Sequence, residues 1–349
     1  MEYLPLTSAA LIQWAANATI AFIVAFALTP LWTAVLYRYR LGKKVRNTGA
    51  TPIFSLLHKS KEGTPTMGGV IIWATTALLF FVFSYFDSTN IASRAQTILP
   101  MGFLLMAAGV GLIDDLFNIF GRGPNSGGLR MRHRFIAYTF IAVIGAIWFW
   151  SKLEWSSIYV PFTGFVDIGF WFVPVFVLII IATGFSVNEI DGLDGLAGGT
   201  LLVSFLVLST VALFEGKFAL SAFLALIVGS LLAFLWFNIH PARFFMGDTG
   251  AMSLGVMLGV VAILTHTELY LPVFGLLFVF ESLSVIFQII WRKLFGRKLL
   301  KSAPLHHHFE AIGWGEPKIV MRFWVVSGVA GVAAVLLILL DPSFPLLGR

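Results

Sequence analysis

The chain has 349 residues, of which 58% are hydrophobic, 11% are charged and none is cysteine. Soluble domains are about 45–50% apolar and about 25% charged, and disordered chains are poor in apolar residues, so both classes are excluded. The lack of cysteine also excludes disulfide frameworks and thiolate metal sites. The net charge of +6 fits an anionic membrane surface or a nucleic acid, and the apolar content favours the membrane and excludes nucleic acid. We expect an all-α polytopic membrane protein.

Ten apolar runs are long enough to cross a bilayer as helices, which requires about 20 residues each. The runs are Leu11–Tyr37, Met67–Phe86, Gln96–Ile113, Phe135–Ser151, Phe170–Val187, Leu196–Phe214, Phe218–Phe237, Ala251–His266, Leu269–Trp291 and Phe323–Leu340. Nineteen of the 23 Lys and Arg residues lie in the connections that follow odd-numbered spans. Because basic connections stay in the cytoplasm, we expect both termini on the outer, periplasmic side.

The polar segments between the spans are too short to form a second domain. The longest ones and those with acidic motifs cover residues 38–66, 115–134, 188–195, 238–250 and 292–322, all on the expected cytoplasmic side. Residues 1–349 are therefore predicted to form a single integral membrane domain with its active-site loops facing the cytoplasm.

The first polar motif, Lys61–Gly69, enters the second span. It combines a lysine, two threonines and three glycines, which are residue types that bind phosphate. Its spacing is not that of a P-loop, and it lies between helices instead of following a strand. Alone it is a weak indication.

The second motif is Asp114-Asp115 at the inner end of the third span. Adjacent helical residues point about 100° apart, so one carboxylate can bind a cation while the other acts as a base. A solvated helix end is the structural alternative. Acidic residues at a helix C-terminus oppose the helix dipole, so this pair requires a cationic partner.

Two more aspartate motifs precede the sixth and eighth spans. Asn188, Asp191 and Asp194 alternate with glycines, which allow close approach to a ligand, although either aspartate can instead cap a helix. Asn238 and Phe245 lead to Asp248, which is flanked by glycines at a helix start. Such a position suits an N-cap, or a magnesium ligand beside a phosphate.

The last candidates follow the eighth span. Glu281 and Gln288 lie seven residues apart in the ninth span and hence roughly on one helix face, and a carboxyl within the membrane is a functional candidate. His306, His307 and His308 are consecutive in the last cytoplasmic loop. Because consecutive side chains diverge, they suit phosphate or sugar oxygens better than zinc. A solvated loop is the alternative.

Carboxylates for a hard cation and groups that bind phosphate thus gather at one membrane face, which indicates a membrane-bound phosphotransferase. A secondary transporter for an anionic metabolite is the alternative from another class. Transporter sites lie near the bilayer midplane between repeats, whereas these charges lie at one interface and no internal repeat is visible.

The motifs, in this order, resemble those of the phospho-N-acetylmuramoyl-pentapeptide-transferase family. The resemblance extends from about Arg46 to Trp324, and its most specific part is Pro304–Glu310 with the three histidines. Related polyprenyl-phosphate N-acetylhexosamine-1-phosphate transferases share the aspartate motifs but differ there, and they remain the alternative within this chemistry.

The resemblance implies a homodimer with ten spans in the bacterial cytoplasmic membrane. It also implies a Mg²⁺-dependent reaction in which phospho-N-acetylmuramoyl-pentapeptide passes from UDP-MurNAc-pentapeptide to undecaprenyl phosphate and UMP is released. By position, Asp248 is the implied magnesium ligand, Asp114 deprotonates or receives the lipid phosphate nucleophile, Asp115 supports the site and His307 completes it. The residues implied to bind substrate are Lys61, Thr66, Asn188, Asp191, Asp194, Asn238, Phe245, Gln288, His306 and His308.

Several positions depart from the family pattern. Glu189-Ile190 stand where Leu-Thr is usual, which adds a charge beside Asn188. Arg134 stands where a lysine is expected, and arginine keeps the charge but not the compact donor geometry of an ammonium group.

Overall fold

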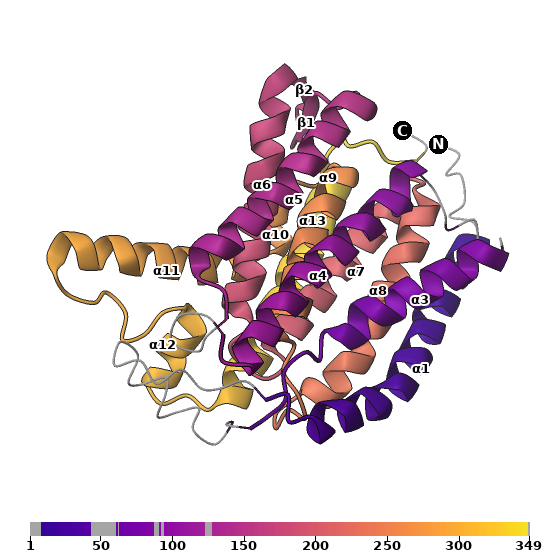
Figure 1. The fold of residues 1–349 in the computed structure, drawn as a ribbon. Helices are drawn as coiled ribbons and strands as arrows, with labels where there is room; N and C mark the ends of the chain where they lie inside the picture. The colour runs from indigo at the N-terminus through magenta and orange to yellow at the C-terminus, as the bar shows by residue number, and fades with distance from the viewer. Residues whose placement is uncertain are drawn as a thin grey trace.

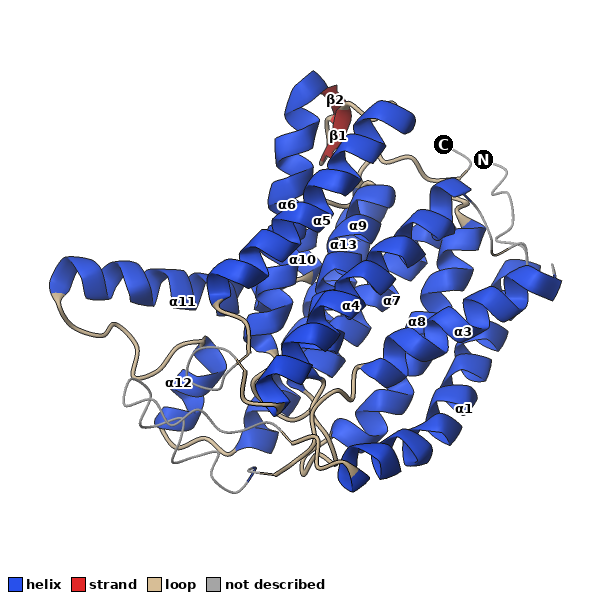
Figure 2. Cartoon of the chain, in the orientation of Figure 1, coloured by secondary structure: helices blue, strands red, loops and turns tan. Residues whose placement is uncertain are grey.

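The computed structural model describes residues 8–42, 61, 63–86, 91, 94–122 and 128–347. They form a bundle of helices with one short β-hairpin (Figures 1 and 2). The helices are α1 Ser8–Arg38, α3 Val70–Phe86, α4 Leu99–Ile119, α5 Met131–Lys152, α6 Phe172–Ile190, α7 Leu196–Phe214, α8 Phe218–Asn238, α9 Gly247–Leu264, α10 Leu271–Phe274, α11 Leu276–Phe295, α12 Leu305–Ala311 and α13 Glu316–Leu340, with short helical turns at Arg94–Ile98 and Gly169–Trp171.

Eight helices within the described residues are long and apolar enough to cross a membrane: α4 together with its preceding turn, and α1, α5, α6, α7, α8, α9 and α13. This confirms the prediction of an all-α polytopic membrane protein. Of the other two predicted spans, α3 has 17 residues. The ninth, Leu269–Trp291, is divided at Gly275 into α10 and α11.

The division at Gly275 changes the direction of the chain. The Gly275 amide donates to Leu271 O (2.7 Å) and closes α10, and α11 then extends sideways from the bundle (Figure 1). Apolar side chains on α11, including Phe287, Leu294 and Phe295, are exposed. The apolar run predicted the length of this segment but not its bend.

Helix α9 lies at the centre of the bundle. All 18 of its residues are buried, and it packs against α4 and α6. Its glycines and other small residues allow such close packing, as is usual between membrane helices. Peripheral helices expose apolar side chains instead, for example Leu31 on α1 and Phe140 on α5. Asp248, in the first turn of α9, is buried at the end of this central helix.

The two ends of the bundle differ. At one end, which we call the hairpin end, β1 (Ser157–Val160) pairs antiparallel with β2 (Gly164–Asp167). The start of α1 lies there, because Trp14 Nε1 donates to Ser209 Oγ near the end of α7 (2.6 Å). The other, which we call the motif end, contains the C-terminus of α1, where Tyr37 donates to Arg243 O (3.0 Å). The hairpin was not predicted, since its short strands carry no clear alternation.

Asp341, directly after α13, links three elements at the hairpin end. Its Oδ2 accepts hydrogen bonds from the hydroxyls of Tyr159 (2.8 Å) and Tyr270 (2.6 Å) and from the Phe162 amide (2.8 Å). Burial alone raises the pKa of Asp341, but these bonds and one from Ser343 outweigh it and hold the pKa well below its usual value. The hairpin end is thus fastened by an ionised carboxylate, and it contains the starts of α1 and α10 and the end of α13.

A partly buried ionic cluster lies beside it, formed by Glu215, Lys217, His266 and Glu268. Lys217 Nζ lies 3.0 Å from Glu215 Oε2, and the Tyr159 amide donates to Glu268 Oε1 (2.7 Å). Burial raises the pKa of Glu215 and that of Glu268 to about 7. Burial, with the nearby Lys217 charge, lowers the pKa of His266 to about 3.

The raised carboxyl pKa values predict that stability falls as the pH rises. Glu268 binds more protons in the folded than in the unfolded state between pH 4.5 and 7, so its stabilising contribution is complete below pH 4.5 and is lost as the pH rises through 7. His266 acts in the opposite sense, contributing stability above pH 6.5 that is lost as the pH falls towards 3. Glu268→Gln keeps an acceptor for the Tyr159 amide and removes the titration. We expect the variant to lose less stability than the wild type between pH 5 and pH 8, by up to about 3 kcal/mol.

Thermal unfolding in detergent across this pH range measures the effect. The matched control is Glu154→Gln, which changes an exposed glutamate near the same end of the bundle. Parallel curves for Glu268→Gln and the wild type would show that Glu268 does not titrate there.

Candidate active site

The polar motifs meet at the motif end. Helix α4 ends beyond Asp114 and Asp115, α6 ends just after Asn188, α8 ends at Asn238, and α9 begins beside Asp248. The Lys61–Gly69 motif touches the motif around Asp248 through two glycines. A Cβ at Gly69 would lie only 2.3 Å from Gly250 Cα, so a larger residue would not fit. Because consecutive spans run in opposite directions, the C-terminus of one helix and the N-terminus of the next lie at the same end of the bundle. The motifs at these termini therefore come together.

Arg134, near the start of α5, joins three of these motifs. Its Nε lies 2.6 Å from Asp114 Oδ2 and its Nη2 lies 3.0 Å from Asp248 Oδ2. Its Nη1 donates to Asn188 Oδ1 (3.0 Å), and Asn188 Nδ2 donates to Asp248 Oδ1 (2.8 Å). The cationic partner that the Asp114-Asp115 pair requires is therefore present, and it comes from a helix 20 residues away in sequence.

The same cluster has the chemistry of a divalent-cation site. Asp114 is fully buried, and its Oδ2 contacts the Arg134 guanidinium group. Two carboxylates, Asp114 and Asp248, share this one guanidinium group. Carboxylate oxygens are the ligands that magnesium prefers, so these residues fit a magnesium ion.

Asp115 has a different position from its neighbour. Its Oδ2 accepts from the Thr249 amide (2.9 Å) and its Oδ1 from the Thr66 hydroxyl (3.3 Å), and both Asp115 and Thr66 are fully buried. Gly247 has a positive φ of 76°, and a Cβ there would lie 2.7 Å from Asp115 Oδ2. Asp115 thus fastens the start of α9 to α4.

A second charged cluster surrounds Lys61. Its Nζ lies 2.7 Å from Asp194 Oδ1 and 2.6 Å from Glu316 Oε1, and His240 Nδ1 lies 3.0 Å from Asp194 Oδ2. The Phe245 ring centroid is 5.8 Å from the same ammonium group. Asp194, His240 and Glu316 are close enough to hold a metal ion, but the Lys61 ammonium group already balances much of their charge.

Sequence reasoning missed His240 and Glu316. His240 lies between Asn238 and Phe245. Glu316 is in the first turn of α13, where an acidic residue is usual in any helix. The predicted Asn238 lies nearby and is buried. Its Oδ1 accepts from the Gly195 amide (3.0 Å) and its Nδ2 donates to Phe244 O (2.8 Å), so it connects two motifs. Asp191 lies partly exposed in the turn between α6 and α7.

The three histidines of α12 have three different partners. His306 is fully buried, and its amide and Nδ1 lie 3.1 Å and 3.0 Å from the carboxylate of Glu281. His307 Nδ1 lies 2.6 Å from Glu310 Oε2. His308 Nδ1 accepts from the Lys301 amide (3.2 Å). Such divergence is incompatible with one metal ion bound by all three.

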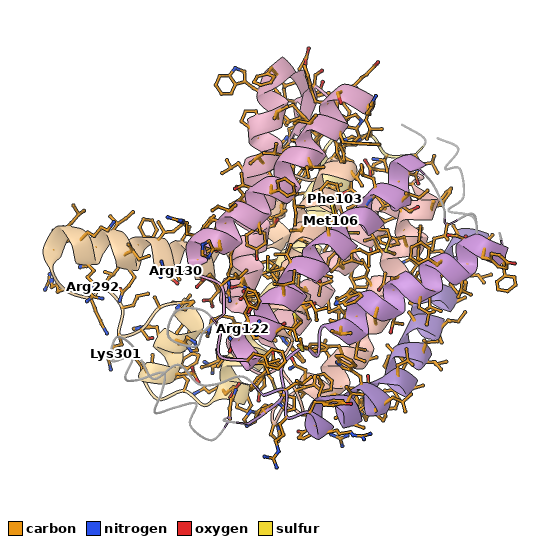
Figure 3. The ribbon with its side chains drawn as sticks, in the orientation of Figure 1. Phe103, Met106, Arg122, Arg130, Arg292 and Lys301 are labelled. Atoms are coloured by element: carbon orange, nitrogen blue, oxygen red, sulfur yellow. The ribbon has the colours of Figure 1, made fainter. Side chains whose placement is uncertain are left out.

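Gln288 holds the loop after α11. Its Oε1 accepts from the amides of Leu299 (3.0 Å) and Leu300 (2.9 Å). Basic side chains Arg122, Arg130, Arg292 and Lys301 lie in the same region, around α11, α12 and the start of α5 (Figure 3), and all four residues are exposed. The motif end is therefore positively charged around its acidic centre.

The Glu281–His306 contact predicts a structural role for the carboxyl within α11. Glu281→Ala leaves the amide and Nδ1 of His306 buried without this acceptor, which costs about 1–3 kcal/mol. We expect a lower midpoint of thermal unfolding in detergent and easier proteolysis of α12. Phe280→Leu, at the neighbouring exposed position, is the control. An unchanged midpoint for Glu281→Ala would exclude the role.

Comparison with known proteins identifies the family. The model of glycosyl transferase family 4 matches residues 97–266, and signature 1 of phospho-N-acetylmuramoyl-pentapeptide-transferase matches residues 61–72. The chain is 39% identical to the phospho-N-acetylmuramoyl-pentapeptide-transferase of Desulforudis audaxviator over 90% of its own length and 95% of the relative's. It is 37% identical to that of Chloroflexus aggregans, over 96% and 93%. The chain therefore belongs to the phospho-N-acetylmuramoyl-pentapeptide-transferase family.

Proposed function

We propose that this chain transfers phospho-N-acetylmuramoyl-pentapeptide from UDP-MurNAc-pentapeptide to undecaprenyl phosphate, with release of UMP, in peptidoglycan synthesis. The observation that carries the proposal is the cluster of Asp114, Asp248, Asn188 and Arg134 at one end of a membrane-spanning bundle, in a chain of this family. Phosphoryl transfer requires a positioned nucleophile and charge stabilisation at one point. The end of a membrane-spanning bundle is where a soluble donor and a lipid acceptor meet.

Asp248 is the proposed ligand of a magnesium ion, with Asp114 beside it. The ion, when bound, neutralises charge on the transferred phosphate. Asp114 deprotonates the lipid phosphate or attacks the donor itself, and Asp115 holds the start of α9 in register through the Thr249 amide. His307, oriented by Glu310, is the proposed fourth catalytic group.

The donor is proposed to bind around the Lys61 cluster. Phe245 offers a ring for the uracil base, and its closeness to Lys61 supports this position. The other proposed substrate-binding residues are Thr66, Asn188, Asp191, Asp194, Asn238, Gln288, His306 and His308. Asn238 and Gln288 bind the protein itself through their polar groups and contribute through the loops that they hold. His306 binds Glu281 through Nδ1, while its buried Nε2 has no hydrogen-bond partner among the described residues.

The proposed topology has ten spans in one domain, residues 1–349, with the motif end in the cytoplasm and both termini outside. The common location of the start of α1 and the end of α13 at the hairpin end supports an even number of crossings. The concentration of Lys and Arg in the opposite connections supports the orientation. The protein is proposed to act as a homodimer in the bacterial cytoplasmic membrane.

The decisive experiment gives the purified full chain UDP-MurNAc-pentapeptide, undecaprenyl phosphate and Mg²⁺ in detergent and measures UMP. We expect UMP and lipid product to form in equal amounts and to require all three components. Activity with a UDP-N-acetylhexosamine lacking the peptide, and none with the full donor, would assign the chain to the related transferases. Uptake of donor by sealed vesicles without conversion would indicate a transporter.

A further inference from the structure

The Arg134 guanidinium group occupies the space between the two carboxylates assigned to the cation. It contacts Asp114 Oδ2 at 2.6 Å, Asp248 Oδ2 at 3.0 Å and Asn188 Oδ1 at 3.0 Å. The Arg134 side chain is 11% exposed, and those of Asp114 and Asp248 are 0% and 5% exposed. Water therefore screens these charges poorly, and each contact is stronger than at a surface.

Both oxygens of Asp248 are already engaged. Oδ1 accepts from Asn188 and Oδ2 contacts Arg134. A divalent cation on Asp248 and a guanidinium group on the same carboxylate repel each other at short range. Cation binding therefore requires Arg134 to move from Asp248, or at least to weaken that contact.

The shape of the guanidinium group matters here. Its planar fork reaches three acceptors from three helices at once, as Nε, Nη1 and Nη2 do here. A lysine ammonium group is a compact point charge on a flexible stem and does not reproduce a planar multidentate contact. Arginine at this position therefore holds the two aspartates more firmly than the lysine that the family resemblance leads one to expect.

We propose that Arg134 is a built-in counter-cation that positions Asp114 and Asp248 when no metal is bound and sets the affinity for the divalent cation by competing for Asp248. This inference rests on the proposed function, because it takes Asp248 as the cation ligand. Arg134, which does not bind the cation, thus sets the affinity for it. Removing the competitor strengthens cation binding even though it weakens the metal-free fold.

The test measures cation binding without turnover. Mn²⁺ is titrated into the full chain in detergent without substrates, and free Mn²⁺ is followed by electron paramagnetic resonance. For Arg134→Gln we expect a Kd for Mn²⁺ about tenfold lower than that of the wild type, which corresponds to about 1.4 kcal/mol. Arg134→Lys keeps the charge and should fall between the two.

Thermal unfolding supplies a second readout. Without metal, Arg134→Gln should unfold at a lower temperature than the wild type, because Asp114 and Asp248 then repel each other without a cation between them. Saturating Mg²⁺ should raise its midpoint by more than it raises that of the wild type. If Arg134 only filled space, its replacement would lower the midpoint by the same amount with and without Mg²⁺. Arg132→Gln, an exposed arginine on the same helix, is the matched control and should leave Mn²⁺ binding unchanged.

The outcomes separate the two proposals. Equal or weaker Mn²⁺ binding by both Arg134 variants, with wild-type binding that Asp248→Asn abolishes, overturns the counter-cation role and leaves the magnesium site standing. If the wild type binds no Mn²⁺ at Asp248, the cation assignment itself fails, and the inference falls with it. If Arg134→Gln does not fold, the Kd of Arg134→Lys decides.

Discussion

Asp248→Asn is expected to lower the rate of UMP release on the order of a thousandfold while leaving the fold intact, a loss typical of removing one charge-stabilising element from a phosphoryl-transfer site. Asparagine has nearly the same size, so it fits at the start of α9. Its one oxygen can accept from Arg134, while the hydrogen bond from Asn188 Nδ2 is lost. The negative charge, which the proposed magnesium ion needs, is lost. UMP release at saturating substrates and thermal unfolding of the same preparation measure the two effects.

The control for this change is Asp167→Asn in β2. Asp167 is an exposed aspartate at the hairpin end whose Oδ1 accepts from the Gly169 amide (3.0 Å), and the substitution should leave UMP release unchanged. If Asp248→Asn retained full activity, Asp248 would not be the metal ligand. If Asp248→Asn unfolded, its loss of activity would not report on the chemistry. Mn²⁺ binding by Asp248→Glu would then be measured instead.

Asp114→Asn is expected to have a loss of similar size for a different reason. The side chain keeps an acceptor for the Leu129 amide, which donates to Asp114 Oδ1 (2.6 Å). It loses the charge on the carboxylate oxygen that contacts Arg134 Nε at 2.6 Å. The proposed base or nucleophile is this carboxylate, so the measured quantity is again UMP release, now as a function of pH.

Asp115→Asn is the matched comparison, because the two aspartates are adjacent in α4 and equally buried. Asp115 accepts from Thr249 and Thr66, so its replacement should mainly lower the midpoint of thermal unfolding. A pH–rate profile of Asp114→Asn with the same shape as that of the wild type would contradict a role as base. A stoichiometric burst of UMP from the wild type without lipid acceptor, absent from Asp114→Asn, would identify Asp114 as a covalent nucleophile.

The sequence predicted the residue types at Asp114 and Asp248, but not the contacts that these residues make. The sequence by itself determined the membrane class, since apolar runs of sufficient length have one stable environment. Helix α7 has the predicted bounds, and α8 begins at the predicted residue, because turns with Gly195 and Gly216 separate strongly apolar segments. The order and residue types of the motifs were enough to indicate phosphoryl transfer and the family.

The tertiary structure alone decided which of those residues meet. Arg134 and Asp248 are 114 residues apart, and Lys61 and Glu316 are 255 apart, so no local pattern pairs them. Helical periodicity sets the direction of a side chain but not the helix that it faces. For this reason the burial of His306 against Glu281, the bend at Gly275 and the location of Arg134 between two aspartates emerged only when the helices were packed together.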